Sequence, residues 1–457
     1  MPVPQRVREV EREIDEAIGG LPIWRARREP LLEKTLELYR DEVEVLLVRM
    51  ACGDLEQLRE FEERRRAGAF QVIKWAMEFG SESGDAVPDV LELQRLVELG
   101  ICYEAFADAL KLANYAAVVI EVDDATQTIT VLEGGERTGQ DANPISHQRR
   151  TLPFRPYPSF VADTDQLTLR WTAGDFRTTI RNLAPIAARE EREVITLAEG
   201  TPLISRPVIC GVGDTWNRSE QAVVEDLTLS REKLLRDKWK LTCFSELPII
   251  QVGPRRLAAS NMLKTLAGWG DNYMPRIAAR IDPRQYSRVS GSREGRMIQR
   301  CREALESDSW QVTPHYMLSA PSKEIDVFAQ RGSVLLVLGL RSMLRPESPW
   351  EVKKRNDYVI EAIEHTVEVL GRFAPLPFGF VLTDGYCGDY ATWEKAIAHG
   401  VGIGSIEDIS DISRDPSTAF DLLKSRVGFN TADQIQPLPD CQCELAGWHL
   451  RLVDAQR

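Results

Sequence analysis

The stretch EIDVFAQRGSVLLVLGLRSML, residues 324–344, constrains the fold of this chain more than any other. A continuous apolar run over residues 334–340 follows the turn signal Arg331-Gly332, so we expect a buried strand paired with the acidic strand that precedes it. The run is far too short to cross a bilayer. The stretch therefore predicts the interior of a sheet in a globular domain.

The pattern around this hairpin is orderly and alternates between strand and helix. An antiparallel start followed by helix–strand crossovers predicts a mixed sheet with helices on both faces, an α/β domain. The expected elements are a helix at 292–307, strands at 310–318, 324–329 and 333–341, a helix at 351–373, a strand at 378–384, a helix at 391–400 and a strand at 401–406.

In the rest of the chain, the spacing of apolar residues changes from one region to the next. Helical spacing of apolar residues runs to about residue 115, and a period of two then predicts a hairpin. We expect further strands at 166–172 and 192–200 and a helix at 229–239. The fold class is a multidomain α/β protein, α+β overall. Its predicted parts are a helical domain (1–115), a mixed α+β region (116–275), the mixed-sheet domain (276–410) and a tail (411–457).

Composition excludes several classes of protein. The 457 residues, 43% hydrophobic and 28% charged, have the balance of a globular protein of two or three domains. The charged start of the chain has no apolar signal region, so we expect a cytoplasmic protein with no membrane partner. Eight cysteines form no framework. Cys441 and Cys443, with His449 nearby, are spaced too closely for a zinc knuckle, and an incidental pair is favoured.

A basic segment stands out in a chain whose net charge is −13. Eight arginines lie between residues 276 and 302 against two acidic residues, an excess of six positive charges. Such a run is usually a solvated surface. Its position just before the acidic strand favours contact with phosphate. The candidate nucleic-acid-binding residues are Arg276, Arg280, Arg284, Arg288, Arg293 and Arg296, with Lys353 and Lys354 on the following helix.

The element order and the hairpin together resemble the PD-(D/E)XK restriction-endonuclease-like superfamily over residues 290–406, about a quarter of the chain. The resemblance implies a strand aspartate at Asp326, a second acidic residue at position 339, a lysine at 341 and a helix carboxylate at Glu294. This chain has Gly339 and Arg341 instead. Alternation supports the register, since Val337, Gly339 and Arg341 share one strand face.

The two departures weaken the chemistry that the resemblance implies. Mg²⁺ or Mn²⁺ requires oxygen ligands, and position 339 has lost one. Asp326 and Glu294 remain as metal ligands, with Glu324, two residues from Asp326, as a substitute. Arg341 stays protonated, so it stabilises phosphate charge but cannot accept a proton. Three carboxylates on the next helix are candidates for relocated ligands: Glu351, Glu361 and Glu364.

Three hypotheses follow. The favoured one is a nuclease-like nucleic-acid-binding protein with a degenerate metal site, an accessory subunit of a bacterial defence or DNA-processing system. The second is an active Mg²⁺-dependent endonuclease with relocated ligands, using Asp326, Arg341 and Glu294. The third is an interaction scaffold without nucleic-acid binding. The expected ligand is DNA, with RNA as the alternative, and the N-terminal helices are expected to bind a protein partner or a second copy.

Overall fold

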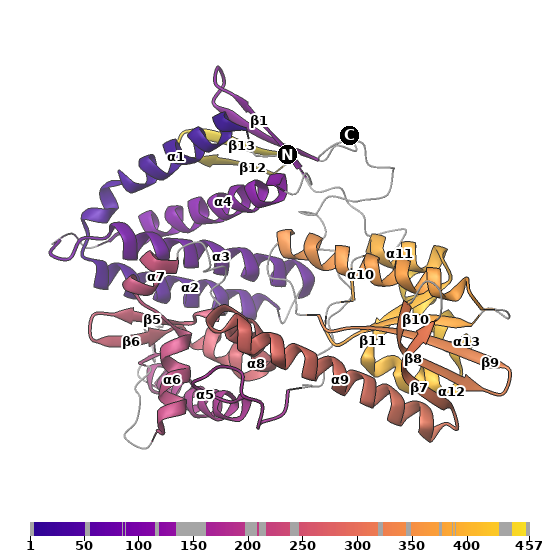
Figure 1. Ribbon diagram of the computed structural model, residues 1–457. Coiled ribbons are helices and arrows are strands. Elements are labelled where there is room, and N and C mark those ends of the chain that lie inside the picture. The colour runs from indigo at the N-terminus through magenta and orange to yellow at the C-terminus, as the bar shows by residue number, and fades with distance from the viewer. Residues whose placement is uncertain are drawn as a thin grey trace. The chain divides into compact units, whose positions relative to one another are not determined.

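The computed structural model divides the chain into two compact units (Figure 1). The first comprises Met1–Glu136, Asp163–Gln285 and Asp440–Arg457, and the second is built around Tyr286–Pro439. The structure describes residues 4–50, 55–84, 86, 88–114, 118–133, 161–196, 208–209, 216–237, 246–318, 323–343, 349–373, 377–385, 387–388, 390–428 and 441–453.

The first unit begins with the predicted helices. These are α1 (Gln5–Gly19), η1 (Pro22–Arg25), α2 (Arg28–Met50), α3 (Leu55–Phe79) and α4 (Val90–Asn114). The predicted hairpin follows as β1 (Val118–Asp123) and β2 (Thr128–Glu133). The remaining elements are α5 (Ala173–Thr196), β3 (Val208–Ile209), α6 (Arg218–Leu227), β4 (Thr228–Leu229), α7 (Arg231–Asp237), β5 (Ile249–Val252), β6 (Arg255–Ala258), α8 (Ser260–Ile281), β12 (Cys441–Leu445) and β13 (Trp448–Val453).

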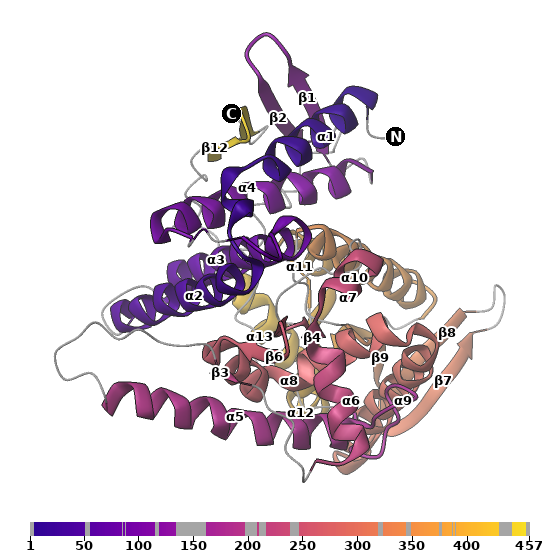
Figure 2. The same cartoon turned by 90° about the vertical axis from the view of Figure 1, so that its left-hand side faces the viewer.

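A four-stranded sheet, in the order β1-β2-β13-β12, joins the two ends of the chain. β13 pairs parallel with β2, from His449 opposite Thr128 to Val453 opposite Leu132. One sheet face is apolar, with Ile129 and Leu450 fully buried. Helices α1 and α4 cover the sheet, and α4 lies between it and α3 (Figure 2). A second small sheet has the order β3-β6-β5-β4.

The second unit follows the predicted order of elements. It contains α9 (Pro283–Ser307), which starts three residues before the unit does, then β7 (Gln311–Leu318), β8 (Lys323–Arg331), β9 (Val334–Arg341), α10 (Pro349–Leu370), β10 (Phe378–Thr383), α11 (Tyr390–Ala398), β11 (Val401–Ser405), η5 (Ile406–Asp408), α12 (Ile409–Arg414) and α13 (Pro416–Gly428). The sheet order is β11-β10-β9-β8-β7. Strands β7, β8 and β9 are antiparallel neighbours, whereas β9, β10 and β11 run parallel. The mixed α/β architecture is therefore confirmed.

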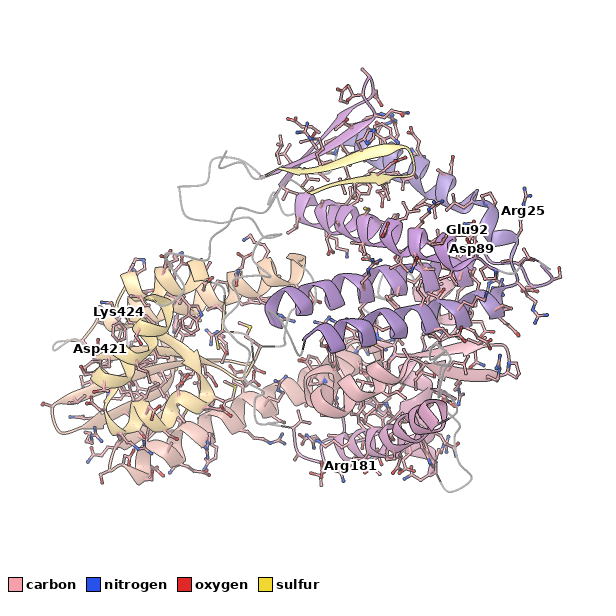
Figure 3. All side chains as sticks on the ribbon, turned by 180° about the vertical axis from the view of Figure 1, so that it is seen from behind. Arg25, Asp89, Glu92, Arg181, Asp421 and Lys424 are labelled. Atoms are coloured by element: carbon pink, nitrogen blue, oxygen red, sulfur yellow. The ribbon has the colours of Figure 1, made fainter. Side chains whose placement is uncertain are left out.

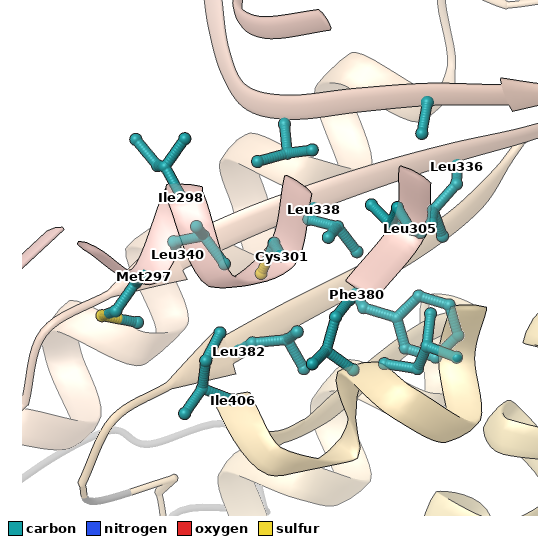
Figure 4. Close-up of a cluster of buried hydrophobic side chains, with 14 of the residues drawn as sticks. Met297, Ile298, Cys301, Leu305, Leu336, Leu338, Leu340, Phe380, Leu382 and Ile406 are labelled. Atoms are coloured by element: carbon teal, nitrogen blue, oxygen red, sulfur yellow. The ribbon is translucent and has the colours of Figure 1, made fainter. Parts of the chain in front are cut away.

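Each face of this sheet buries its own core. Leu336, Leu338 and Leu340 pack against α9, α12 and α13 (Figure 4). Val337 faces the other way, among residues of α10 and α11. This alternation along β9 matches the predicted register. The covering helix α9 contributes a stripe at helical spacing, Met297, Ile298, Cys301 and Leu305, all buried.

Some predictions for the middle and the end of the chain are corrected. Residues 192–196 are the last turn of α5 rather than a strand, and residues 197–200 lie outside the described residues. Residues 166–172 contain an isolated bridge in place of the predicted strand. The predicted 411–457 tail is divided between the units. Its helix α13 buries Ala419 and Leu423 in the second core, while Asp421 and Lys424 are exposed (Figure 3).

Strands β12 and β13 belong to the first unit, because β13 pairs with β2, and β12 pairs with β13 and packs on α4. The local sequence pattern does not predict that a strand at the end of the chain pairs with a strand near its beginning. None of the helices in the described ranges combines the length and apolar character needed to cross a membrane.

Candidate functional site

Asp326 lies where β8 separates from β9. The backbone pairing of these strands ends at Val327 opposite Leu338, and beyond this pair the Asp326 carboxylate takes the place of a backbone acceptor. Its Oδ2 accepts a hydrogen bond from the backbone N–H of Leu340 at 2.6 Å. Arg341 Nη1 lies 3.3 Å from the same oxygen and donates to the Leu340 carbonyl at 2.7 Å. The structure thus brings Asp326 and Arg341 together.

Glu294 lies on the face of α9 that turns toward this point. It is half-buried, one turn before the buried Met297 and Ile298. Partial burial and the nearby charge of Asp326 raise the pKa of the Glu294 carboxyl, with Arg341 opposing the shift. Glu294 is therefore an electrostatic neighbour of both predicted strand residues.

Glu324 behaves differently from its prediction. Strand alternation is interrupted at Asp326, because Ile325 packs in one core and Val327 in the other, so the two-residue spacing does not decide the face of Glu324. Its Oε1 lies 2.7 Å from Nδ1 of His315, an exposed pair. His315 has φ +50°, which sequence reasoning did not anticipate.

Gly339 is held against α10. A Cβ atom on this glycine would lie 3.1 Å from Oγ1 of Thr366, which is buried and donates to the Ala362 carbonyl. A carboxylate at position 339 would require Thr366 to move. The close approach of the helix is thus a packing reason for the glycine at the position where the resemblance implies an acidic residue.

A buried carboxylate, Asp384, directly follows β10, in an Asp-Gly pair that is typical of a turn. Asp384 Oδ2 accepts hydrogen bonds from Arg293 Nη2 at 2.6 Å and Ser342 Oγ at 3.2 Å. Its Oδ1 accepts the backbone N–H of Met343 at 2.8 Å. In the described part of the chain, Arg293 Nε and Nη1 have no hydrogen-bond partner. The position of Asp384, after a buried parallel strand, is the signal that could have found it.

The predicted basic segment is divided between the interior and the surface. Arg276 is 6% exposed and Arg293 7% exposed, and both guanidinium groups are paired with buried carboxylates. Arg280 is half-buried, with Nε 3.3 Å from Glu246 Oε2. Burial takes Arg276 and Arg293 out of the set of residues that a phosphate can reach in this structure, which corrects that part of the prediction. Arg284, Arg288 and Arg300 are exposed on α9, and Arg296 is half-buried.

The candidates on α10 are mostly at the surface. Glu361 and Glu364 are exposed and Glu351 is half-buried; Glu364 Oε1 lies 2.9 Å from Lys395 Nζ of α11. Lys353 pairs with Asp357 one turn later, and Lys354 is exposed. These carboxylates do not complete a metal centre with Asp326.

The donor set does not fit a catalytic divalent metal. Among the residues that the structure describes, no three His, Cys, Asp or Glu side chains are grouped to hold a metal ion. Asp326 Oδ2 already accepts from the Leu340 N–H and faces the Arg341 cation. Magnesium needs several oxygen ligands in a near-octahedral arrangement, which this constellation does not supply.

No protein-family model matches the chain, and no curated protein matches it. Two solved structures are similar to it at 12% identity over 72% of this chain. One is Can2 from Sulfobacillus thermosulfidooxidans in complex with cyclic tetra-adenylate, with a TM-score of 0.20 and 73% of that chain covered. The other is protein VC1899 from Vibrio cholerae, with a TM-score of 0.19 and 74% covered. At these TM-scores the similarity establishes neither a shared fold nor a shared ligand.

Proposed function

We propose that the second unit is a nucleic-acid-binding domain related to the PD-(D/E)XK nucleases whose metal site is degenerate. The proposed role of the protein is that of an accessory subunit in a bacterial defence or DNA-processing assembly. The observation that carries the proposal is the ion pair between Arg341 and Asp326, with Glu294 beside it. In this arrangement a permanent cation takes the place beside the strand aspartate that a divalent metal would need.

The guanidinium group suits phosphate binding better than hydrolysis. Arg341 is half-buried and its side chain keeps 32% of its surface exposed, so part of its planar donor set is open to a ligand. Arginine stays protonated at any physiological pH, and it can therefore bind a phosphodiester but cannot activate water as a base. Arg341 is accordingly assigned the role of a phosphate contact.

Exposed arginines of α9 in the second unit are assigned as further phosphate contacts. Arg288 and Arg300 lie on the helix half opposite the buried stripe of Met297, Cys301 and Leu305. Backbone phosphates attract such a surface without reading sequence. Because the net charge of the chain is −13, binding must depend on this local excess of positive charge and must weaken as salt rises.

The test is a salt titration of binding to labelled DNA and RNA, in EDTA, with a double variant, Arg288→Ala and Arg300→Ala. We expect wild-type binding whose logarithmic affinity falls linearly with the logarithm of salt concentration, and a slope about two units shallower in the variant, since each phosphate contact contributes close to one unit. Arg414→Ala, at another exposed arginine, is the matched control and should bind as wild type does.

Two results would remove the proposal. One is the absence of binding to any DNA or RNA at low salt by folded wild-type protein, which favours a scaffold role. The other is equal loss of binding in the Arg414→Ala control, which would show that only total charge matters.

A further inference from the structure

Asp384 connects the ends of three elements of the second unit. It directly follows β10, and its side chain is 0% exposed. Its carboxylate holds the two residues that follow β9, because Oδ1 accepts the Met343 N–H and Oδ2 accepts the Ser342 hydroxyl. The same Oδ2 accepts a hydrogen bond from Arg293 of α9. One buried carboxylate thus joins the ends of β9 and β10 to the helix that covers the sheet.

Arg341 lies between two carboxylates that bind the backbone around it. The pairing of β9 with β10 ends at Arg341 opposite Thr383, so the sheet does not fix the residues that come next. Directly before Arg341, the Leu340 N–H donates to Asp326. Directly after Arg341, the next two residues donate to Asp384. The backbone on both sides of Arg341 is therefore held by acidic side chains.

Stability alone does not explain the buried ion pair of Arg293 and Asp384. Arg293 is 7% exposed, and within the described part of the chain its Nε and Nη1 have no hydrogen-bond partner. Unmade hydrogen bonds of a buried cation carry a desolvation cost, and apolar side chains of similar volume can replace a buried ion pair without loss of stability. A pair of this kind is better explained by the geometry that it fixes. Here that geometry is the backbone after Arg341.

We propose that Asp384 is a positioning residue for nucleic-acid binding, which holds the guanidinium group of Arg341 in place for a backbone phosphate. The inference rests on the proposed function, because it concerns the same phosphate contact. The Arg341 side chain is 32% exposed, and its Nη1 donates to the Leu340 carbonyl, so its direction follows the backbone that carries it. A contact that is ordered before binding loses less conformational entropy on binding. Asp384 is buried and acts through Arg341.

Charge and positioning predict opposite effects for Asp384→Asn. Removing a negative charge from a chain of net charge −13 increases its attraction for phosphate. A carboxylate has two acceptor oxygens, whereas an amide has one. The Asn side chain therefore cannot accept at both positions, and either Met343 or Arg293 loses its partner. Positioning thus predicts weaker binding, although the repulsion between protein and nucleic acid is smaller.

The experiment measures binding of labelled DNA and RNA in EDTA over a series of salt concentrations. It compares full-length wild type, Asp384→Asn, Arg341→Gln and the double variant. We expect Asp384→Asn to bind about tenfold more weakly than wild type, as for the loss of one hydrogen bond to a charged group. The salt slope should become about one unit shallower, as for one phosphate contact. The double variant should bind as Arg341→Gln alone does.

Asp408→Asn is the matched control. Asp408 is another buried carboxylate of the second unit, and it accepts the Ser405 N–H at the end of β11. The substitution removes the same charge and a comparable hydrogen bond, but it leaves the surroundings of Arg341 unchanged. It should bind nucleic acid at least as tightly as wild type does.

Three outcomes would overturn the proposal. They are unchanged or tighter binding by Asp384→Asn, an equal loss of binding in Asp408→Asn, and a further loss in the double variant beyond that of Arg341→Gln. The third would show that the effect does not pass through Arg341. Absence of binding by folded wild type would instead remove the proposed function, and the inference with it.

A second variant keeps the test decisive if urea unfolding shows that Asp384→Asn does not fold. Ser342→Ala removes one donor to Asp384 and leaves the buried ion pair in place. It should weaken nucleic-acid binding in the wild-type background and have no effect in the Arg341→Gln background. Equal binding by Ser342→Ala and wild type would then overturn the proposal.

Discussion

Arg341 Nη1 lies 3.3 Å from Asp326 Oδ2, and the backbone N–H of Leu340 donates to the same oxygen at 2.6 Å. One carboxylate oxygen thus receives a backbone donor and a permanent cation at the point where two strands separate. This relationship holds the end of β9 beside β8. It also occupies one of the two carboxylate oxygens of Asp326.

Replacing Asp326 and replacing Arg341 should lower the free energy of unfolding by different amounts. Asp326→Ala leaves the partly buried Leu340 N–H without its partner, and we expect a loss of about 1–3 kcal/mol in the free energy of unfolding. Arg341→Gln removes only a partly exposed ion pair, and a loss below about 1 kcal/mol is expected. Urea unfolding of both single variants and the double variant measures this. An equal cost for the two would contradict the assigned hydrogen bond.

Gly339 should resist enlargement. Gly339→Ala places a Cβ 3.1 Å from Thr366 Oγ1, so we expect a destabilisation of about 1–3 kcal/mol. Adding Thr366→Ala should recover part of it. The matched control is Gly295→Ala on α9, where a Cβ meets no atom within 4 Å and helix propensity predicts a gain of about 0.5–1 kcal/mol. A neutral Gly339→Ala would remove the packing explanation for this glycine.

Glu294 should make stability depend on pH. Its pKa is raised in the folded state by burial and by Asp326, so the folded state favours the protonated form. The resulting stabilisation is present below the unfolded pKa and is lost as the pH rises through the folded pKa. Glu294→Gln should therefore gain stability relative to wild type between acidic and neutral pH. Thermal melts across this range test it, and a constant difference would show that the pKa of Glu294 is not raised in the folded state.

The buried pair of Arg293 and Asp384 should be essential for folding. Arg293→Met leaves the Asp384 carboxylate, whose side chain is 0% exposed, without its cation, and a cost of about 3–5 kcal/mol is expected. Arg302→Met, which breaks an exposed pair on the same helix, should cost below about 1 kcal/mol. If denaturant titrations gave similar losses in the free energy of unfolding for Arg293→Met and Arg302→Met, the ion pair between Arg293 and Asp384 would not stabilise the fold as proposed.

The element order of the second unit could be predicted because its periodicity is strong and local. Residues 334–340 are apolar without interruption, and the stripe from Met297 to Leu305 repeats at helical spacing, so both strand and helix follow from pattern alone. The same helical spacing predicted that Glu294 faces the sheet near Asp326. These features need no knowledge of distant contacts.

The remaining features depend on contacts that local pattern does not encode. From the local sequence alone, Asp384 looks like a turn residue. Its ion pair is with Arg293, which lies ninety-one positions earlier in the chain. The return of β13 to β2 joins residues more than three hundred positions apart. Arg276 looks like part of a basic surface, yet it is buried against Glu246. The binding of a partner by the N-terminal helices stays a prediction.

The most direct test of the degenerate site is a titration of Mg²⁺ and Mn²⁺ on labelled DNA and RNA, with binding and cleavage read in the same samples. We expect nucleic acid bound in EDTA to stay intact at every metal concentration, with binding changed only as ionic strength changes. Metal-dependent cleavage by the wild type that disappears in Asp326→Asn would contradict the degenerate site and establish an active nuclease.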